Sequence, residues 1–174
     1  MASARDGGTG QLLGAAITAG LILRLMHYVG QASLSMDESR LANNIAARTL
    51  GQLSTPLDYD QSAPLLFLWV ERLMTRVFGV NELALRAVPM VAGALLLVVA
   101  YPFLRRLVGS RAAVLGVAVL AASPAMVTYS NEIKQYMLEV LVAVVLVRLA
   151  LDTVVAPREP VGFKLAAAGA FAVW

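Results

Sequence analysis

The stretch AVPMVAGALLLVVAYPFL, residues 87–104, decides the fold class, because its 18 residues carry no charge. Two further stretches share this property: residues 112–131 form a run of 20 uncharged residues, and residues 7–23 a run of 17. Runs of roughly 18 or more apolar residues are long enough to cross the hydrocarbon layer of a bilayer as a helix. The sequence therefore predicts an all-α integral membrane protein, a polytopic helical bundle.

The composition excludes several other classes of protein. Of the 174 residues, 59% are hydrophobic and 14% are charged, whereas a soluble domain carries about 25% charged residues. This rules out a soluble enzyme, a disordered tail and a nucleic-acid-binding module. The formal net charge of +3 comes with Arg residues beside the apolar stretches, where they indicate membrane orientation. With no Cys and one His, a disulfide framework, a thiol nucleophile and a site with several His ligands are excluded.

Five membrane spans are expected, at residues 11–28, 83–104, 112–128, 135–151 and 161–174, the last one cut off at the end of the chain. Arg24 lies near one end of the first span, where its side chain is expected to snorkel to the headgroups. Basic residues cluster before span one, between spans two and three, and between spans four and five (Arg5; Arg105, Arg106 and Arg111; Arg148, Arg158 and Lys164). The positive-inside rule then places the N-terminus in the cytoplasm and residues 31–82 on the periplasmic or extracellular side of the cell membrane.

The outer segment, residues 31–82, is too long to be a simple connection. Apolar residues recur at helical spacing in Met36–Thr49 and again, more strongly, in Pro64–Phe78. This pattern predicts two amphipathic helices that lie along the membrane surface. Residues 55–60, between them, are expected to form an irregular loop.

Two adjacent acids, Asp37 and Glu38, follow the first span, and their spacing allows two interpretations. Ser35 and Glu38 fit a capping box, with Ser35 as N-cap, and Asp37 would suit the helix dipole. Acids near a membrane are also functional candidates, because burying a carboxylate there is costly. From spacing alone, capping is favoured over catalysis.

A second group, Glu132, Lys134 and Tyr136, lies where the fourth span is expected to start. Glu132 and Tyr136 are four residues apart and are expected to share one helix face. The alternative is a purely interfacial role, with Lys134 snorkelling and Tyr136 in the aromatic belt. A third pair, Glu82 and Arg86, follows the expected N-cap Asn81 and is interpreted as structural.

Four stretches of the chain, in order, resemble motifs of the GT-C class of membrane glycosyltransferases: residues 35–45 (SMDESRLANNI), 56–65 (PLDYDQSAPL), 78–86 (FGVNELALR), and 123–124 with 129–136 (SP…YSNEIKQY). The similarity is to the protein O-mannosyltransferases and the Rgt-like transferases of glycosyltransferase family 39. It covers about residues 34 to 150.

The resemblance implies an inverting glycosyltransferase that moves a sugar from a polyprenyl-phosphate-linked donor to an acceptor hydroxyl on the outer face of the membrane. Asp37 matches the position of the catalytic acid. A carboxylate there suits a general base, and a lipid phosphate leaving group needs a cation more than an acid. The residues expected to bind substrate are Glu38, Arg40, Glu132, Lys134 and Tyr136. The resemblance fixes no cofactor: the lipid-linked sugar is the donor substrate, and the chemistry leaves room for a divalent cation. The bilayer is the other partner, and no nucleic acid is expected.

One departure separates the chain from the lipid A aminoarabinose transferases, which carry Glu-Lys-Pro-Pro where this chain has Gln61-Ser62-Ala63-Pro64. The Lys that contacts the donor phosphate there is absent, which argues against lipid A modification. Family members are longer, so the chain is expected to be an N-terminal part of such an enzyme and inactive alone. The alternative is a non-catalytic membrane protein: a transporter-like or scaffold subunit, or an inactive remnant. The sugar, the acceptor and the oligomeric state are not specified by these residues.

Overall fold

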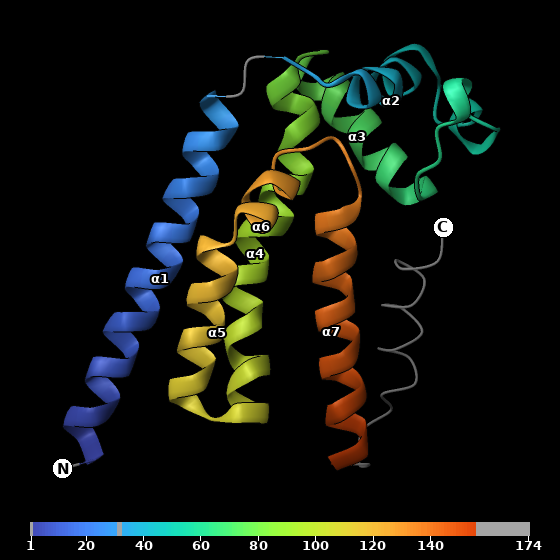
Figure 1. Cartoon of the computed structure of the whole chain (residues 1–174). Coiled ribbons are helices and arrows are strands. Elements are labelled where there is room, and N and C mark those ends of the chain that lie inside the picture. Colours follow the sequence, from blue (N-terminus) through green and yellow to red (C-terminus); the bar gives the residue numbers. More distant parts are fainter. Residues whose placement is uncertain (1, 31–32, 156–174) are drawn as a thin grey trace.

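The computed structural model describes residues 2–30 and 33–155, and every regular element in these residues is a helix. The elements are α1 (Ala2–Gly30), α2 (Met36–Ala47), the 3₁₀ turns η1 (Gln52–Ser54) and η2 (Asp58–Asp60), α3 (Leu65–Phe78), α4 (Glu82–Val108), α5 (Ser110–Ala122), α6 (Pro124–Tyr129) and α7 (Tyr136–Val155). Helices α1, α4, α5 and α7 run lengthwise, and α2 and α3 lie together at one end of them (Figure 1). The all-α prediction is confirmed.

Two of the described helices are long and apolar enough to cross a membrane, α1 over Gly7–Gly30 and α4 over its whole length. They contain the first and second expected spans. The fourth expected span, residues 135–151, falls almost entirely within the 20-residue helix α7. The fifth expected span, residues 161–174, lies outside the described residues.

The third expected span, residues 112–128, is not one continuous helix. Helix α5 ends at Ala122, and α6 begins at Pro124. Proline has no N–H to donate to the preceding turn, and its ring clashes with the carbonyl four residues before it. The Ser123 side chain instead accepts a hydrogen bond from the Met126 N–H and starts a new helix. The third expected span is therefore divided into two helices that meet at Ser123.

The expectation that the Arg24 side chain snorkels to the headgroups was wrong. Its side chain is 0% exposed, so it does not snorkel to the membrane surface. It turns inward from α1 toward α5 and the residue that follows α6, where four acceptors surround it.

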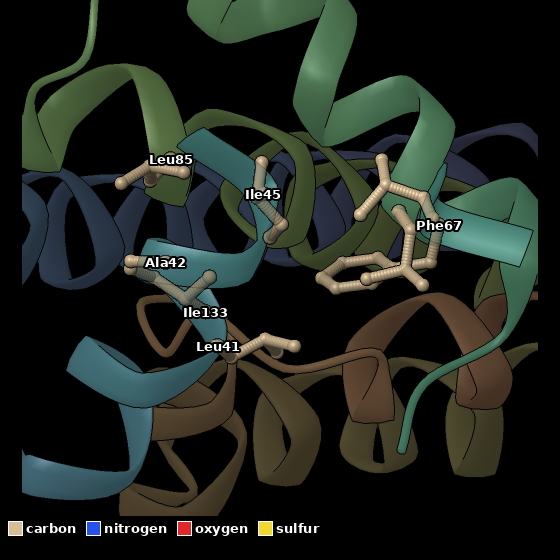
Figure 2. Close-up of a cluster of buried hydrophobic side chains, with 8 residues drawn as sticks. Leu41, Ala42, Ile45, Phe67, Leu85 and Ile133 are labelled. Atoms are coloured by element: carbon tan, nitrogen blue, oxygen red, sulfur yellow. The ribbon is translucent and has the colours of Figure 1, made fainter. Parts of the chain in front are cut away.

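The two helices expected in the outer segment are present as α2 and α3, each close to its predicted bounds. Between them, residues 55–60 are more ordered than an irregular loop, because they include the turn η2. A hydrophobic core joins α2, α3 and α4 to the segment before α7, and Figure 2 shows its members Leu41, Ala42, Ile45, Phe67, Leu85 and Ile133. Burial of a side chain such as Phe67 contributes about 1.5–3 kcal/mol to folding, so this core fixes α2 against the segment that leads into α7.

Candidate active site

The first turn of α2 gives Asp37 and Glu38 opposite surroundings. The predicted capping box is present: the Ser35 hydroxyl accepts a hydrogen bond from the Glu38 N–H, and the Glu38 carboxylate accepts one from the Ser35 N–H at 2.9 Å. Adjacent residues on a helix point about 100° apart. Glu38 is consequently buried, whereas the Asp37 side chain is 57% exposed.

Asp37 forms a compact polar cluster with two residues distant in sequence. The Lys134 ammonium lies 2.6 Å from Asp37 Oδ2, and the Gln61 amide donates a hydrogen bond to Asp37 Oδ1 at 2.8 Å. Lys134 also donates to the Gln61 Oε1 at 3.3 Å. Each of the three side chains therefore contacts the other two, and an acid, a cation and an amide meet at the end of the helices where α2 and α3 lie.

The loop that carries Gln61 is held by the same face of α2. Asn44 exchanges two hydrogen bonds with the backbone of Asp58, at 2.9 and 3.2 Å, and Arg48 pairs with the Asp58 carboxylate at 3.0 Å. Tyr59 and Asp60 then adopt positive φ angles of 63° and 53°, which are uncommon for residues other than glycine. This tight turn brings Gln61 back to Asp37.

Arg40 lies on α2 one turn after Asp37. Its guanidinium carbon is 5.9 Å from the centre of the Tyr59 ring, a cation–π geometry. Arg40 is exposed and adjoins the loop of the site, so the predicted role in binding substrate stays a prediction.

Glu38 connects three segments of the chain. Besides Ser35, its carboxylate accepts a hydrogen bond from the Ile133 N–H at 3.1 Å and pairs with Arg86 of α4 at 3.5 Å. The expected pair between Arg86 and Glu82 is present at 3.8 Å. The contacts of Glu38 are those of a structural residue, and its predicted role in substrate binding is not tested by them.

The segment before α7 differs from the expectation at one point. Glu132 precedes the helix, which begins only at Tyr136, so these two residues do not share a helix face. The turn is closed instead by a bond from the Lys134 N–H to the Glu132 carbonyl, at 2.7 Å. Tyr136 packs edge-on against Tyr129, with ring centres 5.4 Å apart. Lys134 is thus the member of this group that contacts Asp37.

The three acids near the site differ in their electrostatics. Hydrogen bonds from Lys134 and Gln61 hold the pKa of Asp37 below its usual range. Burial acts to raise the pKa of Glu38, but the bonds from the Ser35 and Ile133 N–H groups and the charge of Arg86 leave it lowered. Burial, and then the charge of Glu38, raise the pKa of Glu132. Asp37 is therefore ionised in the resting protein.

Sequence reasoning missed two residues of this region. Gln61 was noted only as a departure from the motif of the lipid A aminoarabinose transferases. Its polar side chain at that position was the signal that could have identified it as a site residue. Glu71 of α3 was given no role from the sequence, yet it is 0% exposed, and among the described residues neither of its oxygens has a hydrogen-bond partner. Burial raises its pKa to about 9. Its place in the inward stripe of α3, with Phe67, Leu68 and Thr75, is the pattern that could have revealed it.

Two hollows adjoin the cluster. One, of about 390 Å³, has Gln61 in its wall and is otherwise lined by residues 53–57, 62, 63, 65 and 68. The other, of about 170 Å³, lies between the start of α3 and α7 and includes Gln135, the neighbour of Lys134. Within the described residues, no group of three or more acidic, His or Cys side chains is placed to hold a metal ion.

Residues 62–173 match the model of the dolichyl-phosphate-mannose-protein mannosyltransferase family, which is well over half of the chain. The chain belongs to this family. No curated protein and no solved structure matches it. Lys134 and Gln135 lie inside the matched residues, whereas Asp37 precedes them.

Membership confirms the predicted resemblance and supports a membrane location, together with a glycosyltransferase activity of the mannosyltransferase type. The family name also describes a sugar carried on a lipid phosphate. These conclusions favour the enzyme over the transporter-like or scaffold alternative.

Proposed function

We propose that this family member is an inverting glycosyltransferase, which transfers a sugar from a polyprenyl-phosphate-linked donor to an acceptor hydroxyl. The observation that carries the proposal is the contact of Asp37 with Lys134, 97 positions apart in sequence and 2.6 Å apart in space. A base for the acceptor and a cation for the leaving phosphate are the two groups that this reaction needs.

The pair suggests how donor binding prepares the base. While Lys134 neutralises Asp37, the carboxylate is a weak base, because a charge-assisted hydrogen bond stabilises its ionised form. A donor phosphate beside Lys134 would compete for the ammonium. Asp37, released from that bond, becomes more basic and is free to accept a proton, while Gln61 continues to orient it.

The chemical step follows from this arrangement. The acceptor oxygen attacks the anomeric carbon from the side opposite the phosphate, and the bond between that carbon and the phosphate oxygen breaks. The hydroxyl proton passes to Asp37, and the polyprenyl phosphate leaves with its charge balanced by Lys134. Attack from the opposite face inverts the anomeric configuration. Arg40 is exposed near the cluster and supplies a second positive charge for the donor phosphate.

The site would face the outer side of the membrane. The cluster lies at the end of the helices where α2 and α3 pack (Figure 1), whereas Arg105, Arg106 and Arg111 flank the opposite end of α4. Under the positive-inside rule that basic end is cytoplasmic. The polytopic arrangement and the cytoplasmic N-terminus belong to this proposal.

A divalent cation also remains a proposal. Asp37 is the exposed carboxylate of the cluster, and a cation there would have to be shared with the donor phosphate, because Mg²⁺ takes carboxylate, phosphate and water oxygens. Donor binding measured with and without EDTA tests it: unchanged binding would exclude a required cation.

Substitution of Asp37 by Asn tests the central assignment. Asn fills the same space and leaves the Ser35–Glu38 capping box in place, but its amide is too weak a base for the reaction. We expect transfer of radiolabelled mannose from polyprenyl-phosphate mannose, assayed in membranes that contain the protein, to fall by about 10²–10⁴-fold. Capture of a photoreactive donor should be retained.

Asp60→Asn is the matched control, because Asp60 is an exposed acid of the same outer segment. Its positive φ of 53° suits Asn, so transfer should stay near the unsubstituted level. Near-normal transfer by the Asp37→Asn protein would refute the role of Asp37 as the base.

A further inference from the structure

We propose that Arg24, inside the first apolar helix, is a positioning residue: it binds the break between α5 and α6 and thereby holds the segment with Lys134 opposite Asp37. The proposal rests on the proposed function in one respect, since it takes Asp37 and Lys134 as the reacting site.

The guanidinium of Arg24 joins three parts of the fold. Its Nη1 donates to the carbonyl of Gly20, one turn earlier in α1, at 3.1 Å, and to the carbonyl of Ala121 at 3.2 Å. Its Nη2 donates to the carbonyl of Leu120 at 3.1 Å, and its Nε donates to the Ser130 hydroxyl at 3.1 Å. A buried charge among apolar helices is tolerated only where such partners exist.

Two of these acceptors exist because of the helix break. In a continuous helix, the N–H groups of residues 124 and 125 would donate to the carbonyls of Leu120 and Ala121. Residue 124 is a proline without an N–H, and α6 restarts there with its own first turn. Both carbonyls are therefore left without helical partners, and Arg24 supplies the missing donors.

The Nε bond connects the break to the active site. Ser130 is fully buried, and its hydroxyl in turn donates to the Met126 carbonyl at 2.6 Å. Four residues later the chain reaches Lys134. On the way, the Ile133 N–H donates to Glu38 at 3.1 Å. The segment 130–134 is thus held at one end by Arg24 and near the other by the neighbour of Asp37.

Two glycines make this arrangement sterically feasible. A Cβ on Gly93 of α4 would overlap Ser130 and lie 3.3 Å from Arg24 Nε, and one on Gly20 would lie 2.8 Å from the Cβ of Ala121. The absence of side chains at these positions lets α1 and α4 approach the break closely enough for the guanidinium to reach all of its acceptors.

Arginine suits this place better than other donors. Its planar guanidinium carries five N–H donors in a fixed fork, whereas lysine offers three from a single atom and glutamine two. A side chain with fewer N–H donors could not bond to the acceptors on α1 and α5 and to Ser130 at the same time. A role limited to stability would require the two α5 carbonyl bonds, but it would not require the bond to Ser130.

The test uses a geometric readout that does not depend on activity. The chain has no cysteine, so Gln61→Cys with Lys134→Cys introduces one thiol pair, at side chains whose polar ends lie 3.3 Å apart. A short bifunctional thiol reagent should crosslink this pair in membranes. Adding Arg24→Gln should lower the crosslinking rate by about tenfold, because the charged hydrogen bonds that hold the segment are lost.

Ser130→Ala separates positioning from stability. It removes the bond that links Arg24 to the segment with Lys134 and leaves the bonds to α5 in place. We expect a reduced crosslinking rate and, without the cysteines, a raised donor KM with a smaller change in kcat. Met26→Gln is the control, since it places the same amide on an exposed position of α1 and should leave both readouts unchanged.

Wild-type crosslinking in both the Arg24→Gln and the Ser130→Ala proteins would overturn the proposal. If Arg24→Gln fails to fold, Ser130→Ala alone decides the outcome. Failure of the proposed function would give a different result. The Asp37→Asn protein would retain transfer, while Arg24→Gln and Ser130→Ala would still lower the crosslinking rate.

Discussion

Glu71 should make the stability of the folded protein depend on pH. Its carboxyl group is 0% exposed and has no hydrogen-bond partner within the part of the chain that the structure describes, and burial raises its pKa from an ordinary 4.5 to about 9. At neutral pH the folded protein therefore keeps a proton that the unfolded chain has released. Raising the pH favours the unfolded chain, so stability is greatest below pH 4.5 and falls as the pH rises toward 9.

The magnitude follows from the difference of one bound proton. Within this window, the free energy of unfolding should fall by about 1.4 kcal/mol for each pH unit. Between about pH 6 and pH 8.5 the loss amounts to roughly 3 kcal/mol, a large part of the usual stability of a domain. Glu71→Gln keeps the size of the side chain and cannot ionise, so it should remove this slope.

The assay is reversible denaturation of the purified protein in detergent, followed by circular dichroism at both pH values. Asp60→Asn serves as the control, because Asp60 is exposed and its loss should leave the slope in place. An equal pH slope in the Glu71→Gln and unsubstituted proteins would refute the reasoning, and would show that Glu71 is ionised or reaches water in the folded state.

Three further predictions concern the site and its support. Lys134→Met should raise the donor KM by about tenfold or more, because a charged contact to phosphate is lost; an unchanged KM would exclude Lys134 from the donor site. Glu38→Gln should lower the thermal midpoint, since breaking a buried ion pair costs about 3–5 kcal/mol; a midpoint within one degree of the unsubstituted protein would contradict the buried pairing. Gly93→Ala should destabilise the protein by about 1–3 kcal/mol, because its Cβ would overlap Ser130, and unaltered denaturation would contradict this packing.

The parts of the fold that could be predicted are those set by neighbouring residues. The start of α2 followed from Ser35 and Glu38, and the start of α4 from Asn81, whose side chain accepts a hydrogen bond from the Ala84 N–H at 2.8 Å. Caps and apolar periodicity act over one or two turns, so the sequence displays them directly.

The parts that could not be predicted depend on contacts between distant segments. Nothing in the local pattern indicates that Lys134 meets Asp37, or that Gln61 completes the cluster. The sequence shows Pro124 near the end of the third expected span, but the Arg24 side chain that bonds to the carbonyls freed by the helix break comes from a distant helix. Arg24 was expected at the membrane surface, but its burial becomes favourable once the break offers it carbonyl acceptors.

The capping box of α2 also sets the rotation of that helix. Ser35 and Glu38 lock the first turn, and Asp37, between them, is directed outward as a result. Deleting one residue between Ser35 and Asp37 would rotate the acids by about 100° and turn the wrong carboxylate toward Lys134. The cap therefore sets the direction in which the Asp37 side chain points from α2. The carboxylates of Asp37 and Glu38 therefore cannot exchange roles. A double substitution of both acids would remove the proposed base and, at the same time, the cap that sets its direction.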